Sequence, residues 1–79
     1  MSPTVLREKG YRFFFFSREE PRCHVHVEAA GGEAKFWLEP ELELAQNYGF
    51  SRKQLKEAEA IVETNYDEIV RAWHEHFES

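Results

Sequence analysis

His24 and His26 are the residues whose type and spacing best suit them for chemistry. They are separated by one residue in a segment, residues 23–29, that is typical of a β-strand. Because successive strand side chains alternate between faces, both imidazoles should project from the same side of a sheet. Two neighbouring groups that titrate near neutral pH can perform acid–base chemistry or hold a metal ion.

One interpretation of this pair is the cleavage of RNA without a metal. One imidazole would remove the proton of a 2′-hydroxyl while the other protonates the leaving oxygen. Lys35, on the neighbouring predicted strand, would stabilise the developing negative charge. Trp37 would stack a base, and Glu39 would orient His24.

Two other interpretations of the histidine pair stay open. In the first, His24 and His26 bind a transition metal, with Glu28 or Glu39 as the third ligand. The sequence has no second cysteine or third nearby histidine to complete that site, so we predict neither a metal nor a cofactor. In the second, the imidazoles lie beside Trp37 under a partner protein or a second subunit, hydrogen-bonded and chemically inert.

The composition is that of one small globular domain over residues 1–79. The chain is 42% hydrophobic and 15% aromatic. A single cysteine cannot form an internal disulfide, and the N-terminus lacks an apolar signal segment, which together predict a cytoplasmic protein. The aromatic run at residues 13–16 is far too short to span a bilayer, so no membrane association is expected.

The charge of the chain is acidic but unevenly distributed. The net charge of −5 argues against loose electrostatic binding to nucleic acid. Residues 1–22 nevertheless carry five basic against three acidic side chains. A local basic patch near the N-terminus is therefore expected.

Residues 3–46 are rich in strand-forming segments. We predict strands over residues 3–7, 11–16, 23–29 and 33–38, with a polar loop over residues 17–22. Pro40 ends the fourth of these strands, because proline cannot donate a hydrogen bond to a neighbouring strand. Residues 42–44 then form either a brief fifth strand or a turn. The segments predict a small antiparallel sheet of three to four strands.

The hairpin around Gly31 and Gly32 predicts a register. If these two glycines form the loop, Ala30 faces Glu33 and the pairing continues outward from there. One face then consists of the apolar pairs Val25–Leu38, Val27–Phe36 and Ala29–Ala34. The other face consists of the complementary pairs His24–Glu39, His26–Trp37 and Glu28–Lys35. The first face is the predicted core, and the second face is the candidate site.

Residues 51–78 have the pattern of a long amphipathic helix. Ser51 and Gln54 form a capping box, and apolar residues then recur at three- and four-residue spacing. We expect one continuous helix packed on one face of the sheet, because the apolar phase does not shift. The alternative is a break near Asn65, which would cap a second helix with Glu68 at its third position. Either version gives an α+β fold.

Aromatic residues fall on both faces of the predicted strand 11–16. Only one face can pack on the helix, so an aromatic patch that includes Trp37 is expected on the histidine face. Such a patch predicts a protein interface, with a twofold homodimer as the default assembly. The alternative is that residues 47–50 fold back and cover it.

Segments along nearly the whole chain resemble one family. They are Pro3–Leu6, Gly10–Phe15, Glu20–Arg22, His24–Val27, Gly32–Pro40, Glu43–Gly49 and Ala72–Phe77. These segments are similar to the small bacterial family numbered 4160 among domains of unknown function. The resemblance implies one component of a two-protein module, encoded beside a second small gene and interpreted as the toxin of a toxin–antitoxin pair.

Two further features are not expected to form a site. Cys23 stands where the family more usually has Met or Pro, and nothing in the candidate site depends on it, so a catalytic cysteine is not expected. His74 and His76 are two residues apart on a helix and should point to different faces. We expect both to be surface residues.

The resemblance implies a toxin-like component of a two-protein bacterial module, and the histidine pair would make it, in one version, a metal-independent ribonuclease. Its catalytic residues would be His24, His26 and Lys35, and its binding or orienting residues would be Trp37, Glu39 and Glu28. The alternative is a non-enzymatic interaction or dimerisation protein whose His, Trp and Phe face is the interface. The expected partners are a cognate small protein and a second copy of the chain, with RNA as a candidate substrate.

Overall fold

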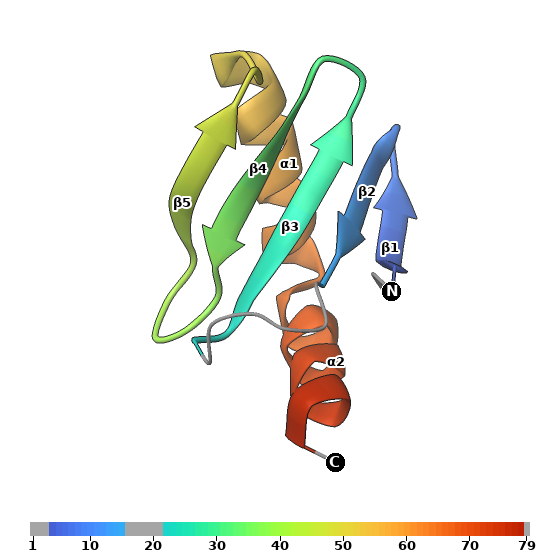
Figure 1. The fold of residues 1–79 in the computed structure, drawn as a ribbon, viewed down its shortest axis with the longest axis vertical. Coiled ribbons are helices and arrows are strands. Elements are labelled where there is room, and N and C mark those ends of the chain that lie inside the picture. Colours follow the sequence, from blue (N-terminus) through green and yellow to red (C-terminus); the bar gives the residue numbers. More distant parts are fainter. Residues whose placement is uncertain (1–3, 16–21, 79) are drawn as a thin grey trace.

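A five-stranded antiparallel sheet with two helices on one face makes up the fold (Figure 1). The computed structural model describes residues 4–15 and 22–78. The strands follow one another in chain order across the sheet: β1 (Thr4–Glu8), β2 (Tyr11–Phe14), β3 (His24–Ala29), β4 (Gly32–Trp37) and β5 (Glu43–Tyr48). The helices are α1 (Arg52–Thr64) and α2 (Tyr66–Glu78). The predicted α+β class is confirmed. Pro3, Phe16 and most of the predicted loop over residues 17–22 lie outside the described residues.

The sheet has five strands, so the prediction of three to four strands is wrong. The segment predicted at residues 42–44 overlaps the start of β5, which begins at Glu43 and continues to Tyr48. Most side chains of this strand are exposed. A strand that packs little of its surface shows no apolar alternation, and its sequence therefore gives little sign of it.

The helical half is broken into two helices of 13 residues each, so the expectation of one long helix is wrong. The break is at Asn65, the position of the alternative. Its side-chain amide donates to the Ile61 carbonyl at 2.8 Å, and its own carbonyl accepts the Ile69 amide at 3.0 Å. The amide side chain thus competes for the helical ladder at this point. The predicted capping box of Ser51 and Gln54 at the start of α1 is present.

The β3–β4 hairpin turns at Ala30 and Gly31, one residue earlier than predicted. Ala29 pairs with Gly32, so every predicted partner is displaced by two residues. Gly31 has φ +92°, which suits the turn, whereas Gly32 lies in β4. A Cβ at Gly32 would lie 2.5 Å from the Tyr48 carbonyl oxygen. Gly31 therefore supplies the positive φ of the turn, and Gly32 leaves room for the backbone at the end of β5.

The displacement by two residues leaves the two faces of the hairpin as predicted, because side chains repeat every second residue. The apolar face packs on the helices and forms the core. Its residues from the strands, and from the positions directly after β2 and β4, include Tyr11, Phe13, Phe15, Val25, Val27, Ala34, Phe36 and Leu38, and its helix residues include Ala58, Ile61, Val62, Ile69 and Trp73. The second face of the sheet carries the histidines, and we call it the open face. Within the described part of the chain, neither helix is long and apolar enough to cross a membrane.

Candidate functional site

The open face brings together most of the residues predicted to form the site. His24, His26 and Glu28 alternate along β3, and Lys35 and Trp37 alternate along β4. His24 pairs with Trp37, and His26 pairs with Lys35. The predicted partners were Glu39 and Trp37, respectively. The convergence of these five side chains follows from the strand period, while their pairing follows from the turn.

His24 lies at the end of the open face and is fully buried. Its side chain is 0% exposed, and its ring lies 4.8 Å from the Trp73 ring of α2 and 5.6 Å from the Trp37 ring, between centroids. Its Nδ1 lies 2.6 Å from the Arg22 carbonyl, which can only accept, so Nδ1 carries the proton. Figure 1 shows why a helix residue reaches this position: α2 extends past the ends of the strands. Burial keeps this imidazole away from a large substrate.

His26 is half-buried and packs on an aromatic neighbour from β2. The rings of Phe14 and His26 are stacked with centroids 5.5 Å apart. The Arg12 guanidinium lies 4.5 Å from the Phe14 centroid and bonds Glu28 at 2.8 Å. Phe14 is thereby only 3% exposed although it points away from the core. The aromatic patch expected from strand 11–16 is thus covered at Phe14 by polar neighbours.

Two cationic side chains lie over the half-buried ring of Trp37 on the open face. The Arg22 guanidinium lies 4.2 Å from its ring centroid, and the Lys35 ammonium nitrogen lies 4.4 Å from it. Arg22 also approaches Glu43 of β5 at 3.5 Å. Cations over an indole ring are attracted by its quadrupole. The Lys35 side chain therefore lies along the open face beside Trp37 and is not extended into solvent.

A hollow of about 180 Å³ lies on the open face between β3, β4 and β5. His26, Lys35, Gln46 and Tyr48 are among the residues that line it. Tyr48 is 60% exposed, and Leu44 of the same strand is 42% exposed. The alternative in which residues 47–50 cover this face is not what is observed. Phe50 packs in the core, 5.8 Å from Tyr11 between ring centroids, and β5 runs on to Tyr48.

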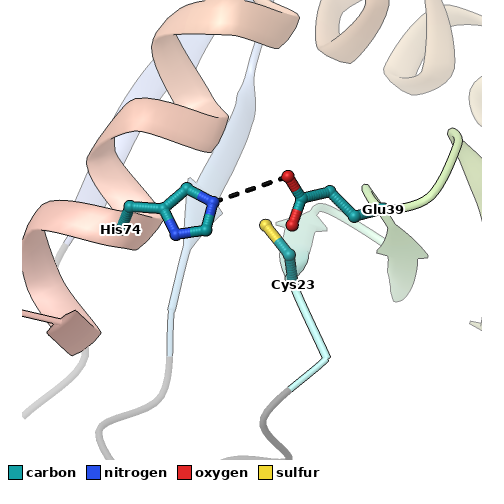
Figure 2. Close-up of side chains that lie close together, drawn as sticks. All are labelled: Cys23, Glu39 and His74. Atoms are coloured by element: carbon teal, nitrogen blue, oxygen red, sulfur yellow. Dashed lines mark hydrogen bonds and ion pairs between the residues drawn. The ribbon is translucent and has the colours of Figure 1, made fainter.

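Cys23, Glu39 and His74 form a second cluster, which the sequence reasoning missed (Figure 2). Glu39 was expected opposite His24 on the open face. Instead its carboxylate lies 3.5 Å from Nε2 of His74 on α2. Figure 2 shows the Cys23 sulfur pointing toward the same two side chains. One donor atom from each of the three residues can be chosen so that all lie within 4.8 Å of one another.

The backbone around this cluster is held by hydrogen bonds. The Leu38 amide donates to the Cys23 carbonyl at 2.9 Å, which extends the β3–β4 pairing by one residue. The Tyr66 hydroxyl donates to the Leu38 carbonyl, and the Arg22 side chain donates to the Glu39 carbonyl at 3.0 Å. Burial raises the pKa of Tyr66, and the nearby charges of Glu39 and Cys23 raise it further. These hydrogen bonds tie α2 to the residues that flank Cys23 and Glu39.

The correct register of β3 and β4 would have predicted part of this cluster. With Trp37 opposite His24, the next residues, Cys23 and Leu38, come together at the strand ends, and Glu39 leaves the sheet toward the helices. His74 directly follows the buried Trp73 on α2. The expectation that His74 is simply a surface residue therefore missed its half-buried contact with Glu39.

Comparison with known proteins identifies a family. Residues 10–74 match the family described as a domain of unknown function, DUF4160, so the chain belongs to that family. Comparison with curated proteins and with solved structures gave no match.

Proposed function

We propose that this member of the DUF4160 family is an interaction protein, one component of a small two-protein bacterial module, that binds a β-strand of its partner protein along β5. The observation that carries the proposal is the exposed edge of the sheet at β5. This strand ends the sheet order, so no other described strand pairs with its outer side. An edge of this kind presents unpaired backbone groups to an incoming strand.

The two edges of the sheet differ in how well they are protected. β1 carries Arg7 and Glu8, whose charges discourage pairing with another chain. On β5 no residue after Glu43 is charged, and Leu44 and Tyr48 expose large apolar surfaces. β5 is therefore the edge that favours a partner.

The open face beside β5 suits a protein better than a polyanion. Arg12 is paired with Glu28, and Arg22 approaches Glu43, so much of the positive charge on the face is balanced. Alternate side chains of a strand added at β5 would lie over this face. The hollow lined by His26, Lys35, Gln46 and Tyr48 would receive one of them.

The ribonuclease interpretation remains the alternative. The His24 and His26 ring centroids are 5.1 Å apart, which is close enough for joint acid–base work. However, His24 is buried against Trp37 and Trp73, and Lys35 is only 7% exposed. A polymer would reach His26 but not His24 without movement of these neighbours. This burial favours the interaction proposal.

The proposal is tested with the product of the neighbouring small gene as the probe. Tyr48→Lys and Leu44→Lys place charges on the exposed edge without touching the core. Each should weaken the partner affinity, measured by calorimetry, by at least about tenfold, equivalent to about 1.4 kcal/mol. Arg71→Ala on the exposed side of α2 is the matched control and should leave the affinity unchanged. Unchanged affinity in both edge variants would overturn the proposal.

A second measurement separates interaction from catalysis. His24→Ala and His26→Ala are compared for growth inhibition on expression, for folding and for partner affinity. Loss of inhibition by each folded variant, with the affinity retained, would establish the acid–base alternative. Intact inhibition in the folded double variant would exclude it and leave the interface interpretation.

A further inference from the structure

We propose that Cys23, Glu39 and His74 form a binding site for a transition metal ion, with Zn²⁺ as the best fit. This site is separate from the open face, and it does not depend on the partner proposed for β5. Its donors come from the residue before β3, the residues after β4, and α2. They meet at the end of the sheet where α2 passes it (Figure 2).

The geometry of the cluster is close to that of a tetrahedral site. With Zn–S and Zn–N bonds of normal length, neighbouring donors in a tetrahedron lie about 3.3–3.6 Å apart. Nε2 of His74 already lies 3.5 Å from a Glu39 oxygen. The other donor separations are no greater than 4.8 Å. Small side-chain rotations would therefore bring all three donors onto one ion.

The donor set also selects the metal. Thiolate sulfur, imidazole nitrogen and carboxylate oxygen together suit Zn²⁺, whereas Ca²⁺ and Mg²⁺ prefer sites built of oxygen alone. Cys23 is buried, while the side chains of His74 and Glu39 are 39% and 44% exposed. Three protein ligands with an exposed side leave a coordination position for water or a substrate, as in catalytic zinc sites.

The surroundings of the cluster support a cation. The backbone of Cys23 and Glu39 is fixed by the hydrogen bonds from Leu38 and Arg22, so two of the donors start from held positions. The carboxylate of Glu39 faces His74 at this point and would offset part of the charge of a bound divalent ion.

The histidine pair is a weaker candidate for the same ion. Nδ1 of His24 faces the Arg22 carbonyl, and the His24 ring lies buried between Trp37 and Trp73. Among the described residues, the grouping of three possible ligands is Cys23, Glu39 and His74, and neither His24 nor His26 belongs to it. We therefore assign the ion to the end of the sheet.

Cobalt is the direct probe of the proposed site. Untagged protein should bind one Co²⁺ and show a thiolate-to-cobalt charge-transfer absorption in the near ultraviolet, which Zn²⁺ then abolishes by displacement. Cys23→Ser should remove the charge-transfer band. His74→Gln, at a half-exposed position that should tolerate substitution, should weaken Co²⁺ binding by at least about tenfold, equivalent to about 1.4 kcal/mol. His76→Gln, two residues along the same helix, should leave both unchanged.

Two outcomes would overturn the metal site. One is Co²⁺ binding without a charge-transfer band, which would exclude Cys23 as a ligand. The other is an equal rise in melting temperature on adding Zn²⁺ to the wild type and to His74→Gln, which would place the ion elsewhere. Neither outcome bears on the partner proposed for β5, because that affinity is measured separately.

Discussion

Tyr66 joins the end of the sheet to α2 and should make the stability of the protein sensitive to alkaline pH. Burial raises its pKa above the usual 10.0, with further contributions from Glu39, Cys23 and Asp67. Above pH 10 the unfolded chain loses this proton while the folded chain keeps it. The stabilising contribution is complete below pH 10 and is lost as the pH rises through the folded pKa. Tyr11 behaves in the same way because of burial and its hydrogen bond to Glu57.

We therefore expect the free energy of unfolding to fall as the pH rises above about 10 toward the raised pKa of the folded chain, by at most about 1.4 kcal/mol per pH unit for each group. Tyr66→Phe should reduce this pH dependence to the part that Tyr11 contributes. It should also cost about 1 kcal/mol at neutral pH, because the bond to the Leu38 carbonyl is lost. Urea unfolding at a series of pH values measures both effects, with the exposed Tyr48→Phe as control. An identical slope in Tyr66→Phe and the wild type would contradict this account.

At the scale of single residues, the sequence predicts which face of the sheet a side chain occupies better than it predicts which residues that side chain contacts. The side shared by His24, His26, Lys35 and Trp37 follows from strand alternation and was predicted. The burial of His24 was not predicted, because it depends on Trp73, which is distant in sequence. Glu39 was assigned to the wrong neighbour, because a turn displaced by one residue carried it past the end of the sheet.

At the scale of elements, Gly32 determines how closely β5 approaches the β3–β4 hairpin. A methyl group there would lie 2.5 Å from the Tyr48 carbonyl oxygen and 2.9 Å from the Phe50 nitrogen, which are both backbone atoms. Gly32→Ala should therefore destabilise the protein by about 2 kcal/mol or more and loosen β5 selectively. Amide hydrogen exchange should show loss of protection over β5 before the rest of the sheet.

Gly31→Ala is the matched control for this prediction. A Cβ at Gly31 meets nothing within 4 Å, so its cost comes only from the positive φ of +92°. That cost is about 1 kcal/mol and should leave exchange in β5 unchanged. Equal exchange in β5 for the two variants would show that the close approach at Gly32 has no structural importance.

The elements that pack on the core could be predicted better than β5, which is mostly exposed. Strands β1 to β4 and the start of α1 follow from apolar patterning and the Ser51 capping box. β5 is mostly exposed, and its sequence therefore lacks that patterning. The break at Asn65 leaves the apolar phase intact, with Val62 and Ile69 buried on either side of it. Periodicity alone therefore could not distinguish one helix from two.

At the scale of the whole molecule, the layered arrangement leaves one face of the sheet uncovered by the helices, and β1 and β5 are its two edges. The class of fold follows from the order of strands and then helices, and it was predicted from the sequence. The location of the most exposed apolar surface was not predicted. It was expected around Trp37 and the phenylalanines, whereas among the described residues it lies at Leu44 and Tyr48 of β5.

We expect the isolated chain to form a twofold dimer by pairing the β5 edges of two copies. A twofold axis perpendicular to the sheet makes the two β5 strands antiparallel, so the backbone groups of one six-residue edge can pair with those of the same edge in a second copy. Sedimentation equilibrium should show a concentration-dependent dimer, and Tyr48→Lys with Leu44→Lys should shift it to monomer while leaving the circular dichroism spectrum unchanged. Because the partner strand is proposed to use the same edge, adding the partner protein should dissociate the dimer. A dimer that persists in the edge variants would mean that another surface associates, and a complex containing both the dimer and the partner would show that the two do not compete for β5.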